Sequence, residues 1–193
     1  MDTKLTGKTR IESDLIGARE IPAEALYGVQ TLRGIENFSI SKFRLSEYPL
    51  FIKGLAITKM AAAMANFELG LLTVEQKDAI IAACGEILDG KHHDQFPVDM
   101  IQGGAGTTTN MNANEVIANR ALELMGHERG EYQYCSPNDH VNCSQSTNDA
   151  YPTAIHIGMY FKHLQLLPHL EELIASFRKK GEEFSQIIKM GRT

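Results

Sequence analysis

The segment 49–70, PLFIKGLAITKMAAAMANFELG, constrains the fold more than any other part of the sequence. It is rich in Ala, Leu and Met, and it is apolar on nearly all sides of a helical projection. A helix of this kind is stable in water only where other elements cover it, because it has no broad polar face to present to solvent. We therefore expect a buried helix over residues 49–70.

Helical spacing recurs along most of the chain. Thr73 and Gln76 form a capping-box pattern, and the apolar positions after them predict a helix that ends at Gly90. Ile117 lies in a further apolar repeat of helical spacing, which Gly126 ends. Together these patterns predict an all-α fold.

The N-terminal segment 1–20 has a different character. It has the features of an extended arm, in which RIESDLIGARE suggests a short strand or hairpin. Pro22 suits the first turn of a helix, because an N–H group is dispensable there. We expect a helix to open at Pro22. No strand-rich segment follows, so the predicted fold class is all-α with a short extended or β arm.

The last fifty residues predict two long helices separated by Pro168. Each carries an apolar stripe, the first formed by Ile157, Tyr160, Phe161 and Leu164 and the second by Leu170, Phe177, Phe184 and Ile188. An exposed stripe of that size favours association. The chain either oligomerises through it or forms the front part of a larger protein, and both can hold.

Composition excludes several classes of partner. The chain has 193 residues and a formal net charge of −5, which argues against nucleic acid and against a polybasic membrane surface. We find no apolar run long enough for a membrane span and no signal peptide, so we expect a cytoplasmic protein. Cys84, Cys135 and Cys143 lack the spacing of metal ligands and are expected to be reduced thiols. No histidine is predicted to bind a metal.

Two polar loops, each followed by a predicted helix, carry the functional signal. They read QGGAGTTTNMNANEV over residues 102–116 and SQSTNDAYPTA over 144–154. Helix starts attract anions through unpaired N–H groups, and the glycines let the backbone approach a ligand. Each loop has more hydroxyl and amide groups than helix capping requires, although capping stays open as the simpler interpretation.

The lysine-poor character of these loops argues against nucleotide binding. A phosphate loop of the Walker type needs Gly-Lys-Ser/Thr, whereas Gly106 is followed by Thr107. No strand-helix-strand unit frames the glycines, as a dinucleotide fold requires. Two hydroxyl-rich clusters suit the two ends of a small dicarboxylate better.

The same stretches closely resemble the fumarase/aspartase superfamily. The resemblance rests on GGAGTTTNMNANEVIANRALELMG, SPNDHVNCSQSTNDAYPTAIHIGMY, the terminal KMGRT and the N-terminal arm, and it covers nearly the whole chain. Class II fumarases typically have other residues at Ala105, Ser136 and Thr147, so the aspartase branch is favoured over a class II fumarase. The resemblance implies a helical domain over 1–145 and the incomplete start of a central helical bundle over 146–193.

The resemblance also implies a reaction: reversible deamination of L-aspartate to fumarate and ammonia in the cytoplasm. A base removes a proton beside the side-chain carboxylate, which gives an aci-carboxylate, and the amine then leaves. Preset hydrogen-bond donors would stabilise the charge that develops on the carboxylate. The implied partner is a small dicarboxylate, L-aspartate or fumarate, with no required cofactor; activation by a divalent cation stays open.

The site residues implied by the resemblance come from both loops and from the C-terminal motif. The expected substrate contacts are Thr107, Ser146, Thr147, Asn148 and Thr193. Gly104, Gly106 and Asn110 are expected to support them. Arg19 and Arg33 are as compatible with a structural ion pair as with substrate binding, and Asp149 is expected to act at a helix start.

The motif that carries the general base in the superfamily is missing from this sequence. The general-base serine lies in a mobile Gly-Ser-Ser loop followed by Met-Pro-x-Lys-x-Asn, and neither pattern occurs in the chain. The resemblance implies a homotetramer whose sites combine residues of three subunits. We therefore expect the 193-residue chain to be a fragment that is inactive by itself. A non-catalytic helical assembly module is the alternative from another functional class.

Overall fold

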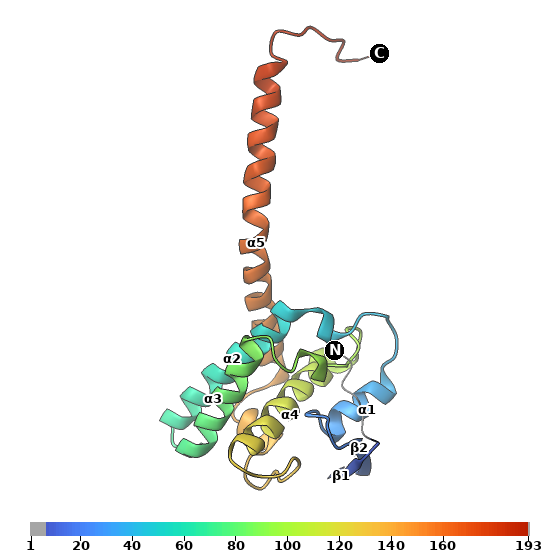
Figure 1. The fold of residues 1–193 in the computed structure, drawn as a ribbon, viewed down its shortest axis with the longest axis vertical. Coiled ribbons are helices and arrows are strands. Elements are labelled where there is room, and N and C mark those ends of the chain that lie inside the picture. Colours follow the sequence, from blue (N-terminus) through green and yellow to red (C-terminus); the bar gives the residue numbers. More distant parts are fainter. Residues whose placement is uncertain (1–6, 193) are drawn as a thin grey trace. The chain divides into compact units, whose positions relative to one another are not determined.

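The computed structural model describes residues 7–192, and it confirms a mostly helical fold with one small β-hairpin. Figure 1 shows the elements along the chain. The strands are β1 (Thr9–Asp14) and β2 (Gly17–Pro22), and the longer helices are α1 (Val29–Asn37), α2 (Pro49–Glu68), α3 (Val74–Leu88), α4 (Thr107–Leu124) and α5 (Thr147–Glu183). Short 3₁₀ turns cover Leu45–Glu47, His93–Gln95 and Gly104–Gly106, and a π turn covers Pro137–Val141.

The chain divides into two compact units, Met1–Gly158 and Met159–Thr193. The first unit contains the hairpin and α1–α4 together with the beginning of α5. The second contains the remainder of α5 and the residues after it. The division into 1–145 and 146–193 that the resemblance implies stays a prediction.

The hairpin confirms the predicted arm, whereas the prediction of a helix at Pro22 is wrong. The two strands are antiparallel, and Pro22 pairs with Thr9 at the end of the ladder. The carbonyl of Pro22 accepts a hydrogen bond from the Arg10 guanidinium at 3.0 Å, so Pro22 belongs to the arm. Helix α1 begins at Val29, where carboxylates from elsewhere in the chain accept the N–H groups of its first turn.

Helix α2 confirms the predicted helix over 49–70. It packs against α3 and α4, and Ile52 and Leu55 are fully buried in the core. Its burial is partial, since Met64 is exposed. By length and composition α2 would also suffice to cross a membrane, so the expectation that no apolar run is long enough is wrong.

Helix α3 begins at the predicted capping box. Thr73 Oγ1 accepts the N–H of Gln76 at 3.2 Å, and the Gln76 side chain accepts the N–H of Thr73 at 3.1 Å. Cys84 of this helix is buried, and the three cysteines are free thiols, as expected. α3 also packs against α4, which lies beside it in Figure 1.

Helix α4 is the most buried element and also carries many polar side chains. The residues between 109 and 119 are all buried, among them Glu115 and Asn119. Buried polar groups are costly unless they form hydrogen bonds, and most of the side chains named here form at least one, although the amide oxygens of Asn110, Asn112 and Asn114 have no partner within residues 7–192. Most of these partners are backbone groups of the loops around α4.

Helix α5 corrects the prediction of two helices. It continues without a break through Pro168. A proline removes one N–H donor and crowds the carbonyl four residues earlier, but the hydrogen bonds on either side remain available. Within the second unit, the predicted apolar residues Leu170, Phe177, Phe184 and Ile188 are exposed.

Gly54 in α2 provides a test of the contact between α2 and the beginning of α5. A Cβ atom at Gly54 would overlap the backbone carbonyl of Ala154, whereas one at Gly85 in α3 would meet no atom within 4 Å. We expect Gly54→Ala to lower the free energy of unfolding by about 1–3 kcal/mol through overpacking. The control Gly85→Ala should raise it by about 0.5–1 kcal/mol, because alanine favours the helix. Urea unfolding followed by circular dichroism measures both, and equal effects would contradict the predicted contact.

Candidate functional site

The two polar loops meet at one cavity of about 390 Å³. Ala105 and Gly106 line it from the first loop, and Asn148 and Tyr151 line it from the second. Residues separated by more than forty positions in the sequence thus come together at the starts of α4 and α5. A small ligand in this cavity could contact one loop at each of its two ends.

The first loop has an unusual backbone. Gly104, Ala105 and Gly106 adopt positive φ angles of 71°, 51° and 91° in succession. Glycine adopts this conformation without steric cost, whereas alanine does so at a cost of about 1 kcal/mol or more. At Gly106 a Cβ atom would also overlap the ring of Tyr151. Thr107 opens α4, is exposed, and donates its hydroxyl hydrogen to the carbonyl of Gly104 at 2.7 Å.

The second loop begins α5 with a reciprocal cap. Ser146 Oγ accepts the N–H of Asn148 at 3.1 Å, and the N–H of Ser146 donates to Asp149 Oδ2 at 3.2 Å. Asp149 therefore acts at the helix start, as expected. Ser146 and Asn148 are exposed, and Thr147 is half-buried.

Asn110 joins the two loops. Its Nδ2 donates to Thr147 Oγ1 at 3.2 Å and to Asn142 Oδ1 at 3.1 Å. The side chain is 1% exposed, and its Oδ1 has no hydrogen-bond partner within the described part of the chain. Its position on α4 is the one expected of a residue that supports the binding loops.

Lys59 is a component of this region that the sequence analysis missed. It is fully buried in α2, and its Nζ donates to Asn142 Oδ1 at 2.9 Å and to Gln145 Oε1 at 3.0 Å. Burial lowers the pKa of Lys59 to about 7. The available signal was a lysine within a segment that is apolar on nearly all sides, since such a charge needs buried partners.

The segment that precedes the first loop is held in place by hydrogen bonds of Asp99 and Gln102. Gln102 Oε1 accepts the N–H of Thr109 at 2.8 Å, and its Nε2 donates to Thr109 Oγ1 at 2.8 Å. Asp99 accepts the hydroxyl of Ser41 and the N–H groups of Ile101, Ser41 and Ile40. The Ser41 hydroxyl, followed by these N–H groups, lowers the pKa of Asp99 to about 2.

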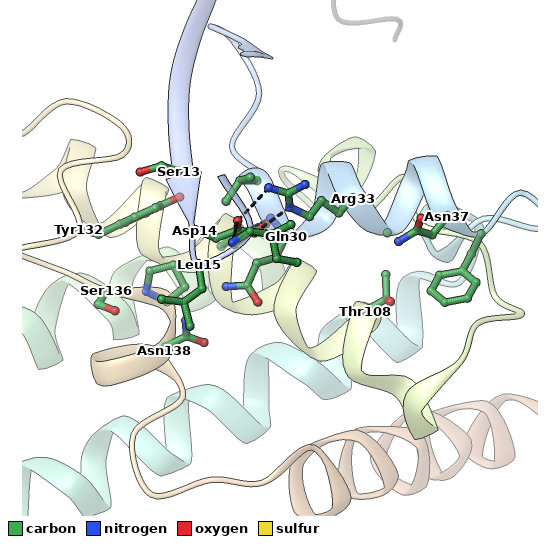
Figure 2. Close-up of a pocket in the computed structure, with 16 residues that line it drawn as sticks. Ser13, Asp14, Leu15, Gln30, Arg33, Asn37, Thr108, Tyr132, Ser136 and Asn138 are labelled. Carbon is green, nitrogen blue, oxygen red and sulfur yellow. Dashed lines mark hydrogen bonds and ion pairs between the residues drawn. The ribbon is translucent and has the colours of Figure 1, made fainter. Parts of the chain in front are cut away.

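A second cavity of about 730 Å³ lies against the hairpin and α1 (Figure 2). Asp14 and Arg33 line it, and Arg33 Nε donates to Asp14 Oδ2 at 2.8 Å. Arg33 thus forms the structural ion pair that was one of its two expected roles. Arg19 lies 3.7 Å from Glu36 in an exposed pair.

The structure places most, but not all, of the predicted site residues. The described substrate-contact candidates Thr107, Ser146, Thr147 and Asn148 lie at the starts of α4 and α5. Of these, Asn148 lines the cavity of about 390 Å³ and the three hydroxyl residues do not; of the supporting residues, Gly106 lines it. Thr193 lies outside the described residues. Within residues 7–192, no group of three or more His, Cys, Asp or Glu side chains is arranged to hold a metal ion.

The Arg33–Asp14 pair makes stability depend on pH. The hydrogen bond from Arg33 lowers the pKa of Asp14 from 3.8 to about 2. The stabilisation is present above pH 3.8 and is lost as the pH falls through the folded-state value near 2. We expect Arg33→Met to flatten the fall in melting temperature between these pH values, and the control Arg19→Met to leave it unchanged. Calorimetry at a series of pH values measures this, and an unchanged slope in Arg33→Met would contradict the assignment.

Comparison with known sequences identifies relatives of this arrangement. The lyase family model matches residues 17–193. The aspartate ammonia-lyase of Pseudomonas canavaninivorans is 59% identical over 95% of this chain and 39% of that protein. The corresponding enzyme of Escherichia coli (strain K12) is 56% identical over 98% of this chain and 40% of that protein. The chain thus spans about 40% of the length of the curated relatives it matches.

Solved structures show the same fold. The crystal structure of fumarate lyase:delta crystallin from Brucella melitensis matches 96% of this chain and 43% of that one, with 53% identity and a TM-score of 0.91. A class II fumarase from Schistosoma mansoni matches 96% of this chain and 39% of that one, with 38% identity and a TM-score of 0.88. The resemblance read from the sequence is confirmed, and the chain belongs to the lyase family.

Proposed function

We propose that the protein to which this chain belongs is an aspartate ammonia-lyase, which converts L-aspartate reversibly to fumarate and ammonia. The observation that carries the proposal is one cavity lined by Gln102, Ala105 and Gly106 of the first loop and by Asn148 and Tyr151 of the second. The identity of 59% to an aspartate ammonia-lyase, against 38% to a class II fumarase, supports aspartate over malate.

The proposed contacts with the substrate are Thr107 from the first loop, Ser146, Thr147 and Asn148 from the second, and Thr193. Hydroxyl and amide groups at two helix starts provide hydrogen bonds and partial positive charge without a lysine. They suit two carboxylates held a short distance apart. Gly104 and Gly106 let the backbone approach, and Asn110 holds the two loops in register.

The proposed chemistry begins with removal of a proton from the carbon beside the side-chain carboxylate. The electron pair of the broken C–H bond moves into that carboxylate and forms an aci-carboxylate. Its collapse forms the double bond and breaks the C–N bond, so that ammonia leaves. Preset donors lower the barrier because the carboxylate carries more negative charge in the transition state than in the substrate.

The general base is proposed to lie in a part of the longer protein that follows this chain in its relatives. The Gly-Ser-Ser pattern that carries it in the superfamily does not occur in this sequence. We further propose that the active protein is a cytoplasmic homotetramer. The exposed apolar residues of the second unit, such as Leu170 and Phe177, support association with further helices.

The substrate is tested with the longer natural protein. Incubation with L-aspartate should release fumarate, followed by its ultraviolet absorbance, and incubation with L-malate should not. Release from malate alone would identify a fumarase, and release from neither would favour a helical assembly module. The 193-residue chain, assayed in parallel, should form no fumarate, because it lacks the base.

The contribution of the second loop is tested with matched threonine variants on α5. Thr147→Val removes the hydroxyl proposed to bind a carboxylate and should lower kcat/KM for L-aspartate by about 10²–10³-fold. Thr153→Val changes an exposed threonine of the same helix and should leave kcat/KM nearly unchanged. Equal values in the two variants would remove Thr147 from the site.

A further inference from the structure

Lys59 is a charged side chain in a place where charge is costly. It lies in the middle of α2 and is fully buried. A buried ammonium group is tolerated only when hydrogen bonds replace its lost hydration. Its partners therefore indicate why the protein keeps a lysine at this position.

The two hydrogen-bond acceptors of Lys59 belong to the segment that leads into α5. The ammonium donates to Asn142 Oδ1 at 2.9 Å and to Gln145 Oε1 at 3.0 Å. These acceptors are neutral amides, and the titratable group that acts electrostatically on Lys59 is the Cys84 thiol of α3, whose pKa burial raises to about 12. The lysine thus donates to two side-chain amides of one segment, and within residues 7–192 no carboxylate accepts a hydrogen bond from it.

The segment 141–145 folds around these two amides. Gln145 Nε2 donates to the carbonyls of Val141 at 2.9 Å and Cys143 at 3.2 Å. Asn142 Nδ2 donates to the carbonyl of Gln145 at 3.0 Å. Lys59 therefore donates to the same two side chains that hold this segment together, and Asn66 of α2 adds a hydrogen bond to the Cys143 carbonyl at 2.9 Å.

This network continues into the candidate site. Asn142 Oδ1 accepts from Asn110 Nδ2 as well as from Lys59, and the same Asn110 nitrogen donates to Thr147 Oγ1. Ser146, the cap of α5, directly follows Gln145 in the chain. The path from Lys59 to a proposed substrate contact therefore passes through hydrogen bonds of 2.9–3.2 Å.

We propose that Lys59 is a positioning residue of the dicarboxylate site, which holds residues 142–147 so that Ser146 and Thr147 face the substrate. The expected effect on KM rests on the proposed function. The hydrogen bonds of Lys59 do not depend on it. Lys59 does not touch the substrate; it acts through Asn142, Gln145 and Asn110.

The experiment uses the longer natural protein with Lys59→Met, which keeps the length and the apolar stem but removes the donors. The matched control is Lys53→Met, which removes a half-buried lysine from the same helix. In Lys59→Met, KM for L-aspartate should rise about tenfold while kcat changes much less, since the site loses its preset geometry. Amide hydrogen exchange over residues 142–149 should accelerate about tenfold. Lys53→Met should change neither.

A merely structural role would lower the amount of folded protein, and hence the apparent kcat, without raising KM, and it would accelerate exchange throughout the first unit and not specifically in 142–149. That result would overturn the proposal. If the natural protein releases no fumarate from L-aspartate, the proposed function fails. Hydrogen exchange still decides the positioning role in that case.

If Lys59→Met does not fold, two variants of its partner decide the question. Gln145→Met and Gln145→Glu both lose the Nε2 donors, but only the glutamate keeps an oxygen that can accept from Lys59. Both variants lose the hydrogen bonds to the carbonyls of Val141 and Cys143, so both should differ from the natural protein. We expect Gln145→Met, which also loses the acceptor for Lys59, to show the larger rise in KM and the faster exchange. Equal behaviour of the two variants would overturn the proposal.

Discussion

The buried polar side chains of α4 are the constraint on which the first unit depends. Glu115, at the middle of this helix, accepts the N–H groups of Gly28 at 2.8 Å, Gln30 at 2.8 Å and Thr31 at 3.0 Å. A carboxylate buried this deeply has its pKa raised by desolvation, and the N–H groups that it accepts oppose that rise. The start of α1 is thereby capped by a residue more than eighty positions away.

Other polar residues of α4 act in the same way on other loops. Asn112 donates to the carbonyl of Gln95 at 3.0 Å, and Asn119 donates to the carbonyl of Leu26 at 2.8 Å. Asn110 donates to Asn142 and Thr147 of the segment that carries the candidate site. Because an unsatisfied polar group in the core is costly, the loops are drawn to positions where they complete these hydrogen bonds. Loops that are hydrogen-bonded to such a helix are held more rigidly than loops on the surface.

Local patterns were sufficient for most helices but failed at two prolines. The capping box at Thr73 and the apolar spacing of α3 and α4 act within a few residues, so they can be read directly from the sequence. Pro22 was predicted to open a helix and instead ends a strand, because its pairing with Thr9 is a contact between segments. Pro168 was predicted to separate two helices, but a single missing N–H did not end α5.

The sequence by itself determined the fold class, the residue types at the two helix starts and the family to which they belong. These features depend on local spacing and on long specific motifs. Only the tertiary structure decided that the two loops share a cavity, that Asn110 joins them, and that Lys59 donates hydrogen bonds to Asn142 and Gln145 before the second. The physical reason is that buried polar groups choose partners by proximity in three dimensions, which no periodicity in the sequence records.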